Sequence, residues 1–144
     1  MMFLTRLRKA FEVGDRLSDG TTVVVVDPRK NVSLRVPGGI FGGESDFHDQ
    51  RDVAKQANEQ SLHGHKDWRV LTGAEAESLA DVWDKVAPPA LQSRDAPWFW
   101  GGPGSLFFSR KGVCNYSVCK GFSSAFIVND VRPVAVIRSG SARP

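Results

Sequence analysis

The sequence predicts a small α+β domain, and three observations carry that prediction. First, residues 14–36 alternate β-branched and other apolar side chains between turn residues, which is typical of a β-hairpin. Second, residues 49–62 and 72–87 place apolar side chains at helical spacing. Third, short β-type segments return after residue 96. The order of strands, helices and strands favours an α+β fold over a parallel βαβ fold.

The hairpin is defined by its turns. An Asp-Gly pair leads into a β-branched run at residues 21–26, and a second turn at 27–31 leads into alternating apolar residues at 32–36. The next segment, residues 37–49, contains four glycines among apolar residues. We expect a mobile loop there, whose apolar side chains either pack down or meet a partner.

The two predicted helices meet at a densely punctuated junction, residues 62–75. Gly64 suits the left-handed residue that closes a helix, and the apolar residues at 68–71 suit a short buried strand. Thr72 and Glu75 have the Thr-x-x-Glu spacing of a capping box. We therefore expect the second helix to begin at Thr72.

The sequence also predicts four later strands, an N-terminal docking segment and a C-terminal tail. The expected strands are residues 97–100, 106–109, 123–129 and 131–138. A short amphipathic helix at 3–11 is expected within an N-terminal docking segment, residues 1–13. The domain itself spans residues 14–138, and a flexible tail follows at 139–144.

Composition limits the class of protein. A chain of 144 residues suits one compact domain. Its formal charge of +3 is unevenly distributed, because residues 44–95 carry six basic and eleven acidic groups while both ends are basic. The sequence lacks the dense Lys/Arg clusters with interleaved aromatics that are typical of nucleic-acid surfaces, so no nucleic-acid partner is expected.

No membrane span or Sec signal is predicted. No apolar run approaches the roughly 20 residues needed to cross a bilayer. Residues 1–11 lack the apolar core of a secretory signal. We expect a cytoplasmic protein, or one that leaves the cell by another route as part of a virion or an injection apparatus.

Neither a metal site nor a catalytic site is predicted, and no cofactor is expected. His48, His63 and His65 do not have the spacing of a zinc helix, and we expect surface or capping roles for them. Cys114 and Cys119 match neither a CxxC redox motif nor a zinc set. Reduced structural thiols are the favoured interpretation, and a local disulfide is the alternative.

Several segments have a recognisable order of residues. They are Gly-Asp-Arg-Leu-Ser-Asp-Gly-Thr at 14–21, His-Gly-His-Lys-Asp-Trp-Arg-Val-Leu-Thr-Gly-Ala-Glu at 63–75, Phe-Trp-Gly-Gly at 99–102 and Val-Arg-Pro-Val at 131–134. Over about residues 14–138 this order resembles the DUF1566 family, also called the Lcl C-terminal domain. The resemblance implies a C-type-lectin-like fold, with two helices packed on antiparallel strands and long Gly-rich loops. Leu71 replaces the family's usual Pro, and Gly101 and Gly102 replace its Ser pair, so the ligand preference of the loops stays open.

A module of this kind is expected to act by binding, without catalysis. Exposed aromatic rings beside Gly-rich loops are favoured interface anchors, with core packing as the alternative for each ring. The predicted binding residues are Phe41, Phe47, Trp98, Trp100, Phe107, Phe108, Tyr116 and Phe122. The expected contact segments are the loops at 38–47, 88–96 and 101–122.

A protein partner is expected, including self-assembly or virion proteins, and a glycan is a second candidate ligand. The favoured role is a phage virion or injection-apparatus accessory protein, either structural or receptor-binding. Two alternatives remain. One is a cytoplasmic protein-binding inhibitor, and the other is a divergent thiol enzyme of the formylglycine-generating fold group.

Overall fold

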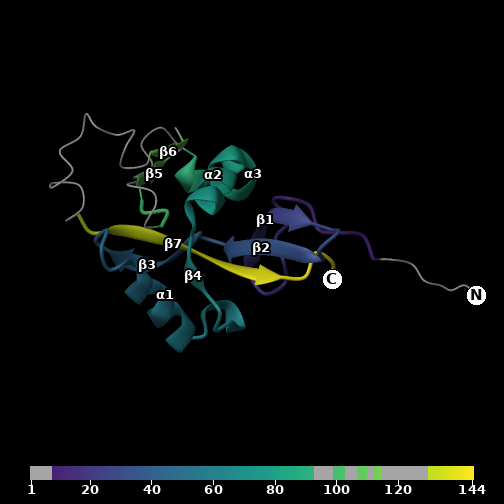
Figure 1. Ribbon diagram of the computed structural model, residues 1–144, viewed down its shortest axis with the longest axis horizontal. Helices are drawn as coiled ribbons and strands as arrows, with labels where there is room; N and C mark the ends of the chain where they lie inside the picture. The colour runs from purple at the N-terminus through teal and green to yellow at the C-terminus, as the bar shows by residue number, and fades with distance from the viewer. Residues whose placement is uncertain (1–7, 93–98, 103–106, 110–111, 115–129) are drawn as a thin grey trace, which may run out of the picture.

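The computed structural model describes residues 8–92, 99–102, 107–109, 112–114 and 130–144. This part of the chain is α+β, with strands packed between helices (Figure 1). The main sheet contains β1 (Thr21–Asp27), β2 (Val32–Pro37), β3 (Phe41–Ser45), β4 (Arg69–Val70) and β7 (Arg132–Gly140). Strands β5 (Phe107–Ser109) and β6 (Gly112–Cys114) form a separate antiparallel pair. The predicted α+β class and the hairpin of β1 and β2 are confirmed.

Strand β7 is the axis of the sheet. Its C-terminal half pairs with β2 and its N-terminal half with β3, both antiparallel. The Val136 N–H donates to the carbonyl of Ile40, which precedes β3, whereas the Ala135 N–H donates to the carbonyl of Trp100. Because successive amides of an extended strand point to opposite sides, Trp100 lies along the other edge of β7. Strand β4 also pairs with β7, antiparallel.

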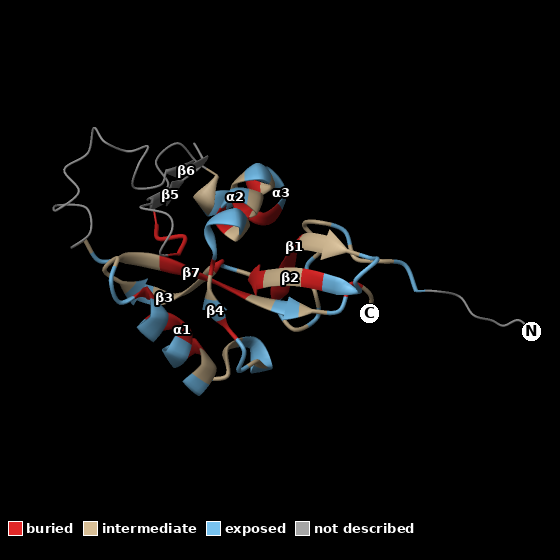
Figure 2. Ribbon diagram, viewed as in Figure 1, coloured by how far each residue is buried: buried red, intermediate tan, exposed pale blue. Residues whose placement is uncertain are grey.

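The side chains of β7 alternate between two cores, one on each face of the sheet. We call the first the α2 core, and its buried members are Val24, Val36, Ile40, Leu71, Ala76, Leu79, Trp83, Val86, Ala87, Phe99, Ala135 and Ile137. The second is the α1 core, whose buried members are Val53, Ala54, Ala57, Trp68, Trp100, Val134 and Val136. Helix α1 (Gln50–Glu59) and the pair α2 (Gly73–Asp81) and α3 (Trp83–Val86) lie on opposite sides of β7 (Figure 1). Buried residues line β7 and the inward faces of these helices (Figure 2).

The predicted capping box is confirmed. The Thr72 hydroxyl accepts the N–H of Glu75 at 3.2 Å, and the Glu75 carboxylate accepts the N–H of Thr72 at 2.9 Å. The single helix expected at 72–87 is instead divided, because Val82 leaves helical geometry at φ −112° and ψ 14°. The break lets Trp83 enter the α2 core and stack on Phe99, with ring centroids 5.3 Å apart.

The prediction of a mobile loop at residues 37–49 is wrong for the central part of this segment, which forms β3. Ile40 is fully buried and adopts a left-handed φ of +74° before β3 begins. The glycines of β3 have a packing role: a Cβ on Gly42 would lie 3.0 Å from a methyl group of Val136. A run of glycines therefore marks a close approach of strands here, not a free loop.

The two ends of the chain also differ from expectation. Residues 8–11 are not helical, and the remainder of the helix expected at 3–11 lies outside the described residues. Strand β7 continues to Gly140, and Ala142 is fully buried with its carbonyl accepting the Phe11 N–H at 2.8 Å. The segment expected as a flexible tail, 139–144, is instead anchored to the sheet.

The late strands agree in part with the sequence pattern. The segments expected at 106–109 and 131–138 correspond to β5 and β7, while β6 was not expected. Of the segment expected at 97–100, Phe99 and Trp100 are described, and Trp100 forms an isolated parallel bridge to Val134. The strand expected at 123–129 lies outside the described residues. Within the described part of the chain, no helix has the length and apolar character to span a membrane.

Candidate functional site

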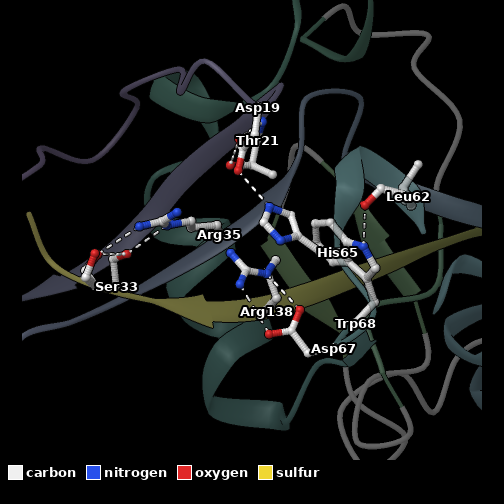
Figure 3. A network of polar contacts seen from close by, with 10 residues as sticks. Asp19, Thr21, Ser33, Arg35, Leu62, His65, Asp67, Trp68 and Arg138 are labelled. Carbon is white, nitrogen blue, oxygen red and sulfur yellow. Dashed lines mark hydrogen bonds and ion pairs between the residues drawn. The ribbon is translucent and has the colours of Figure 1, made fainter. Parts of the chain in front are cut away.

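His65 holds the loop before β1 against the junction between α1 and α2 (Figure 3). Its Nε2 lies 2.8 Å from Asp19 Oδ2, while Asp19 Oδ1 accepts the N–H of Thr21 at 2.9 Å and its hydroxyl at 2.6 Å. Burial raises the pKa of Asp19, but the hydrogen bonds from Thr21 and His65 lower it by more, and the pKa falls well below its usual range. The carboxylate therefore stays ionised at neutral pH and available to His65.

Two further carboxylates of the junction are held by arginine forks. Asp67 accepts two hydrogen bonds from Arg138 of β7, at 2.8 and 3.2 Å (Figure 3). Glu75 accepts two from Arg69 of β4, at 2.6 and 2.7 Å, in addition to its role in the capping box. The hydrogen bonds from Arg138 lower the pKa of Asp67, and those from Arg69 lower the pKa of Glu75. Bidentate pairs of this kind fix geometry as well as charge.

Trp68 is the buried anchor of the junction. Its side chain is 3% exposed in the α1 core, and its indole N–H donates to the carbonyl of Leu62 at 2.9 Å (Figure 3). The amide of Asn58, in the last turn of α1, accepts the backbone N–H of Trp68 at 2.7 Å and donates to its carbonyl at 2.9 Å. The Asn58 side chain thus takes the place of a neighbouring strand at Trp68.

The His65 and Asp19 pair has the composition of a base and its orienting acid, as in sites that activate a nucleophile. Such a site also requires a hydroxyl or thiol at the second ring nitrogen of the histidine. Among the described residues, no group donates to or accepts from that nitrogen. Cys119 and the side chain of Cys114 lie outside the described part of the chain. Within the described part of the chain, the contact of this pair joins the loop before β1 to the junction.

Potential metal ligands do not converge in the described part of the chain. No group of three or more His, Cys, Asp or Glu side chains there is placed to hold an ion. His63 lies beside the turn before β1, where a Cβ on Gly20 would come within 2.7 Å of His63 Nδ1. Its ring packs on Trp68 with centroids 6.4 Å apart. The histidines of the junction are accordingly explained by packing and hydrogen bonding.

The predicted aromatic binding face lies only partly within the described residues. Trp100 is fully buried in the α1 core, and its indole N–H donates to the Ser45 carbonyl at 3.0 Å. Phe41 packs edge-on against Phe99 at 4.7 Å, and Phe47 against Trp100 at 5.3 Å. These contacts place Trp100 in the core and give Phe41 and Phe47 packing roles. The remaining predicted residues lie outside the described residues or have no described side chain: Trp98, Phe107, Phe108, Tyr116 and Phe122.

An open groove runs between α1 and the segment that leads into β4, with a volume of about 720 Å³. We call it the α1–β4 groove. Four basic side chains line it: Arg51, Lys55, Lys66 and Arg69. Glu59 is its one acidic lining residue. Its apolar lining comes from Ala54, Trp68 and Val70.

Three of these four cations have no partner in the described part of the chain. Arg69 is paired with Glu75. By contrast, the side chains of Arg51, Lys55 and Lys66 are exposed and make no hydrogen bond or ion pair with any described residue. Among the residues that the structure describes, no group neutralises the positive charge of these three side chains.

Sequence reasoning missed this groove. Residues 44–95 are acidic on balance, yet four of their six basic residues line it. The spacing of Arg51 and Lys55, four residues apart on a helix, was the one local indication. Lys66 reaches the groove only because β4 brings the junction beside α1, and no spacing rule predicts that approach.

No family model matches this chain, and no curated protein is significantly similar to it. The function is therefore argued from the geometry of the junction and the groove, together with the resemblance in sequence.

Proposed function

We propose that the chain is a non-catalytic binding module and that the α1–β4 groove is one of its contact surfaces. The observation that carries the proposal is the contrast between paired and unpaired charges. The carboxylates of Asp67 and Glu75 in the junction, and that of Asp19 beside it, are paired inside the domain with Arg138, Arg69 and His65. The three groove cations have no such partner among the described residues. Free charges on a rigid scaffold are suited to a second molecule.

The resemblance of residues 14–138 to the DUF1566 family supports the same proposal, and with it a C-type-lectin-like fold. Residues that carry the resemblance have structural tasks in the described chain. Trp68 is an example: it is buried in the α1 core, and its indole N–H donates to the Leu62 carbonyl. A motif that shapes the scaffold leaves recognition to other surfaces.

A photo-crosslinking experiment tests the binding role. A photoreactive phenylalanine analogue in place of Lys55 is expected to capture one protein in constant stoichiometry from a lysate of the source organism. The same analogue in place of Lys30, an exposed lysine in the β1–β2 turn, is the matched control and should capture none. Equal capture at both positions would contradict the proposal.

The setting that we propose is a phage virion or an injection apparatus, with residues 1–13 as the docking segment. The structure sharpens the deletion that tests it. The Phe11 N–H is bonded to Ala142, and the Arg35 guanidinium lies 5.2 Å from the centre of the Phe11 ring, so a deletion should stop at residue 7. Deletion of residues 2–7 is expected to abolish incorporation into particles while the domain keeps its thermal stability. Unchanged incorporation would contradict this setting.

The cytoplasmic inhibitor is separated from the virion accessory by the identity of the captured protein. An inhibitor should crosslink to an enzyme whose activity falls on addition of the purified domain. A virion accessory should crosslink to a particle protein or to a second copy of the chain.

A further inference from the structure

We infer that the α1–β4 groove takes a carboxylate-rich segment of a protein partner. The inference rests on the proposed binding function and adds the chemistry of the occupant. It follows from three features of the groove: its charge, the bonded backbone at Trp68 and its lining.

The charge of the groove favours an anionic occupant that contacts cations both on α1 and on the segment before β4. Arg51 and Lys55 lie one helical turn apart on α1, a separation of about 5–6 Å between Cβ atoms. Lys66 belongs to the opposite wall, on the segment before β4. Among the described lining residues, Glu59 is the one carboxylate, and three cations there have no described partner. Two or more carboxylates along a peptide match this arrangement.

The backbone of the groove argues against recognition by strand addition. An added strand needs free N–H and C=O groups along the edge of β4. At Trp68 both groups are already bonded to the Asn58 side chain, at 2.7 and 2.9 Å. An added strand could not pair with the backbone at Trp68, which favours recognition through the charged side chains of the groove.

The lining favours acidic side chains over nucleic acid. Single-stranded nucleic acids bind through exposed aromatic rings on which bases stack. The aromatic ring of the lining is Trp68, which is only 3% exposed. The half-buried Val70 instead offers apolar surface to the aliphatic part of a glutamate side chain. Glutamate-rich protein is thus the best match in chemistry.

Fluorescence anisotropy with a labelled oligoglutamate peptide tests the inference. The groove variant Lys55→Glu/Lys66→Glu is compared with the control Lys30→Glu/Lys85→Glu, which changes the net charge equally through exposed lysines outside the groove. Each exposed ion pair is worth about 1.4- to 5-fold in affinity, and reversal adds repulsion. We therefore expect the groove variant to weaken binding at least about tenfold, and the control less than about twofold.

Three outcomes would overturn the inference. Equal weakening by the two variants would show that net charge alone attracts the peptide. Tighter binding of an oligo(dT) probe, lost in the groove variant, would assign the groove to nucleic acid. Absence of peptide binding, with successful crosslinking at Lys55, would refute the acidic occupant and leave the binding role intact. Failure of the crosslink as well would remove the proposed function itself.

Discussion

The two faces of the sheet bury different kinds of helix. The α2 core contains large aliphatic and aromatic side chains, and α2 begins with a complete capping box. The α1 core combines small residues of α1 with two tryptophans, and the N-cap residue of α1, Asp49, makes no side-chain capping hydrogen bond. The exposed side of α1 carries Arg51 and Lys55, which pair with none of the residues that the structure describes. One face of the sheet therefore has the larger apolar core, whereas the other combines a smaller core with an exposed cationic groove.

Substitution of Trp100, which packs in the α1 core, is expected to destabilise the domain most. Trp100→Ala removes a fully buried ring and leaves the Ser45 carbonyl without its indole donor. We expect the free energy of unfolding to fall by about 3–5 kcal/mol in urea denaturation. Hydrogen exchange should accelerate more in α1 than in α2, because the cavity opens under α1. Equal acceleration in both helices would show that the two cores do not behave separately.

A smaller loss of stability is expected at Gln50, whose buried side-chain amide links α1 to Gly102 by a hydrogen bond. Its Oε1 accepts the Gly102 N–H at 2.9 Å, and its Nε2 donates to the Phe47 carbonyl at 3.0 Å. Gln50→Leu leaves a buried N–H unpaired and should cost about 1–3 kcal/mol. The exposed Gln56→Leu is the control and should change stability by less than about 0.5 kcal/mol. Similar costs for the two variants would contradict the role of this tie.

The cap of α2 is expected to contribute less again. Thr72→Ala removes the hydroxyl that accepts the Glu75 N–H and should cost about 1 kcal/mol in thermal or urea unfolding. Thr72→Ser keeps the hydroxyl and should restore most of the loss. If the alanine and serine variants are equally unstable, the hydroxyl is not the source of the stabilisation.

The smallest expected effect is on the pH dependence of the unfolding free energy. In the folded state, the arginine partners of Asp67 and Glu75 lower the pKa values of these two carboxyls. The pKa of Asp19 is also lowered, because its hydrogen bonds outweigh the opposite effect of burial. Their contribution is present above the unfolded pKa values of about 4 and is lost as pH falls through the lower folded values. Unfolding free energy should therefore decline below about pH 4, and the decline should be shallower in Asp67→Asn. An unchanged pH profile in that variant would contradict the coupling of Asp67 to Arg138.

Local features were predictable from the sequence because neighbouring residues determine them. The β1–β2 hairpin, the Thr72 cap and the alternation of β7 follow from turn residues, a four-residue motif and a period of two. The course of β3 was missed because its glycines are explained only by the side chains opposite them, such as Val136.

Long-range features were not predictable in the same way. Helical periodicity shows that α1 has an apolar face, but it does not show which side of the sheet that face covers. The groove depends on the same placement, since Lys66 and Lys55 meet only through the approach of the junction to α1. The anchoring of Ala142 likewise depends on Phe11, at the other end of the chain.

We propose that the α1 face, and not the α2 face, receives an acidic protein segment. A titration of the isotopically labelled domain with oligoglutamate, followed through amide chemical-shift changes, tests this claim. We predict changes concentrated at residues 51–59 and 66–70, with α2 and α3 almost unaffected. Changes concentrated in α2 and α3, or spread evenly over all exposed basic residues, would contradict the claim.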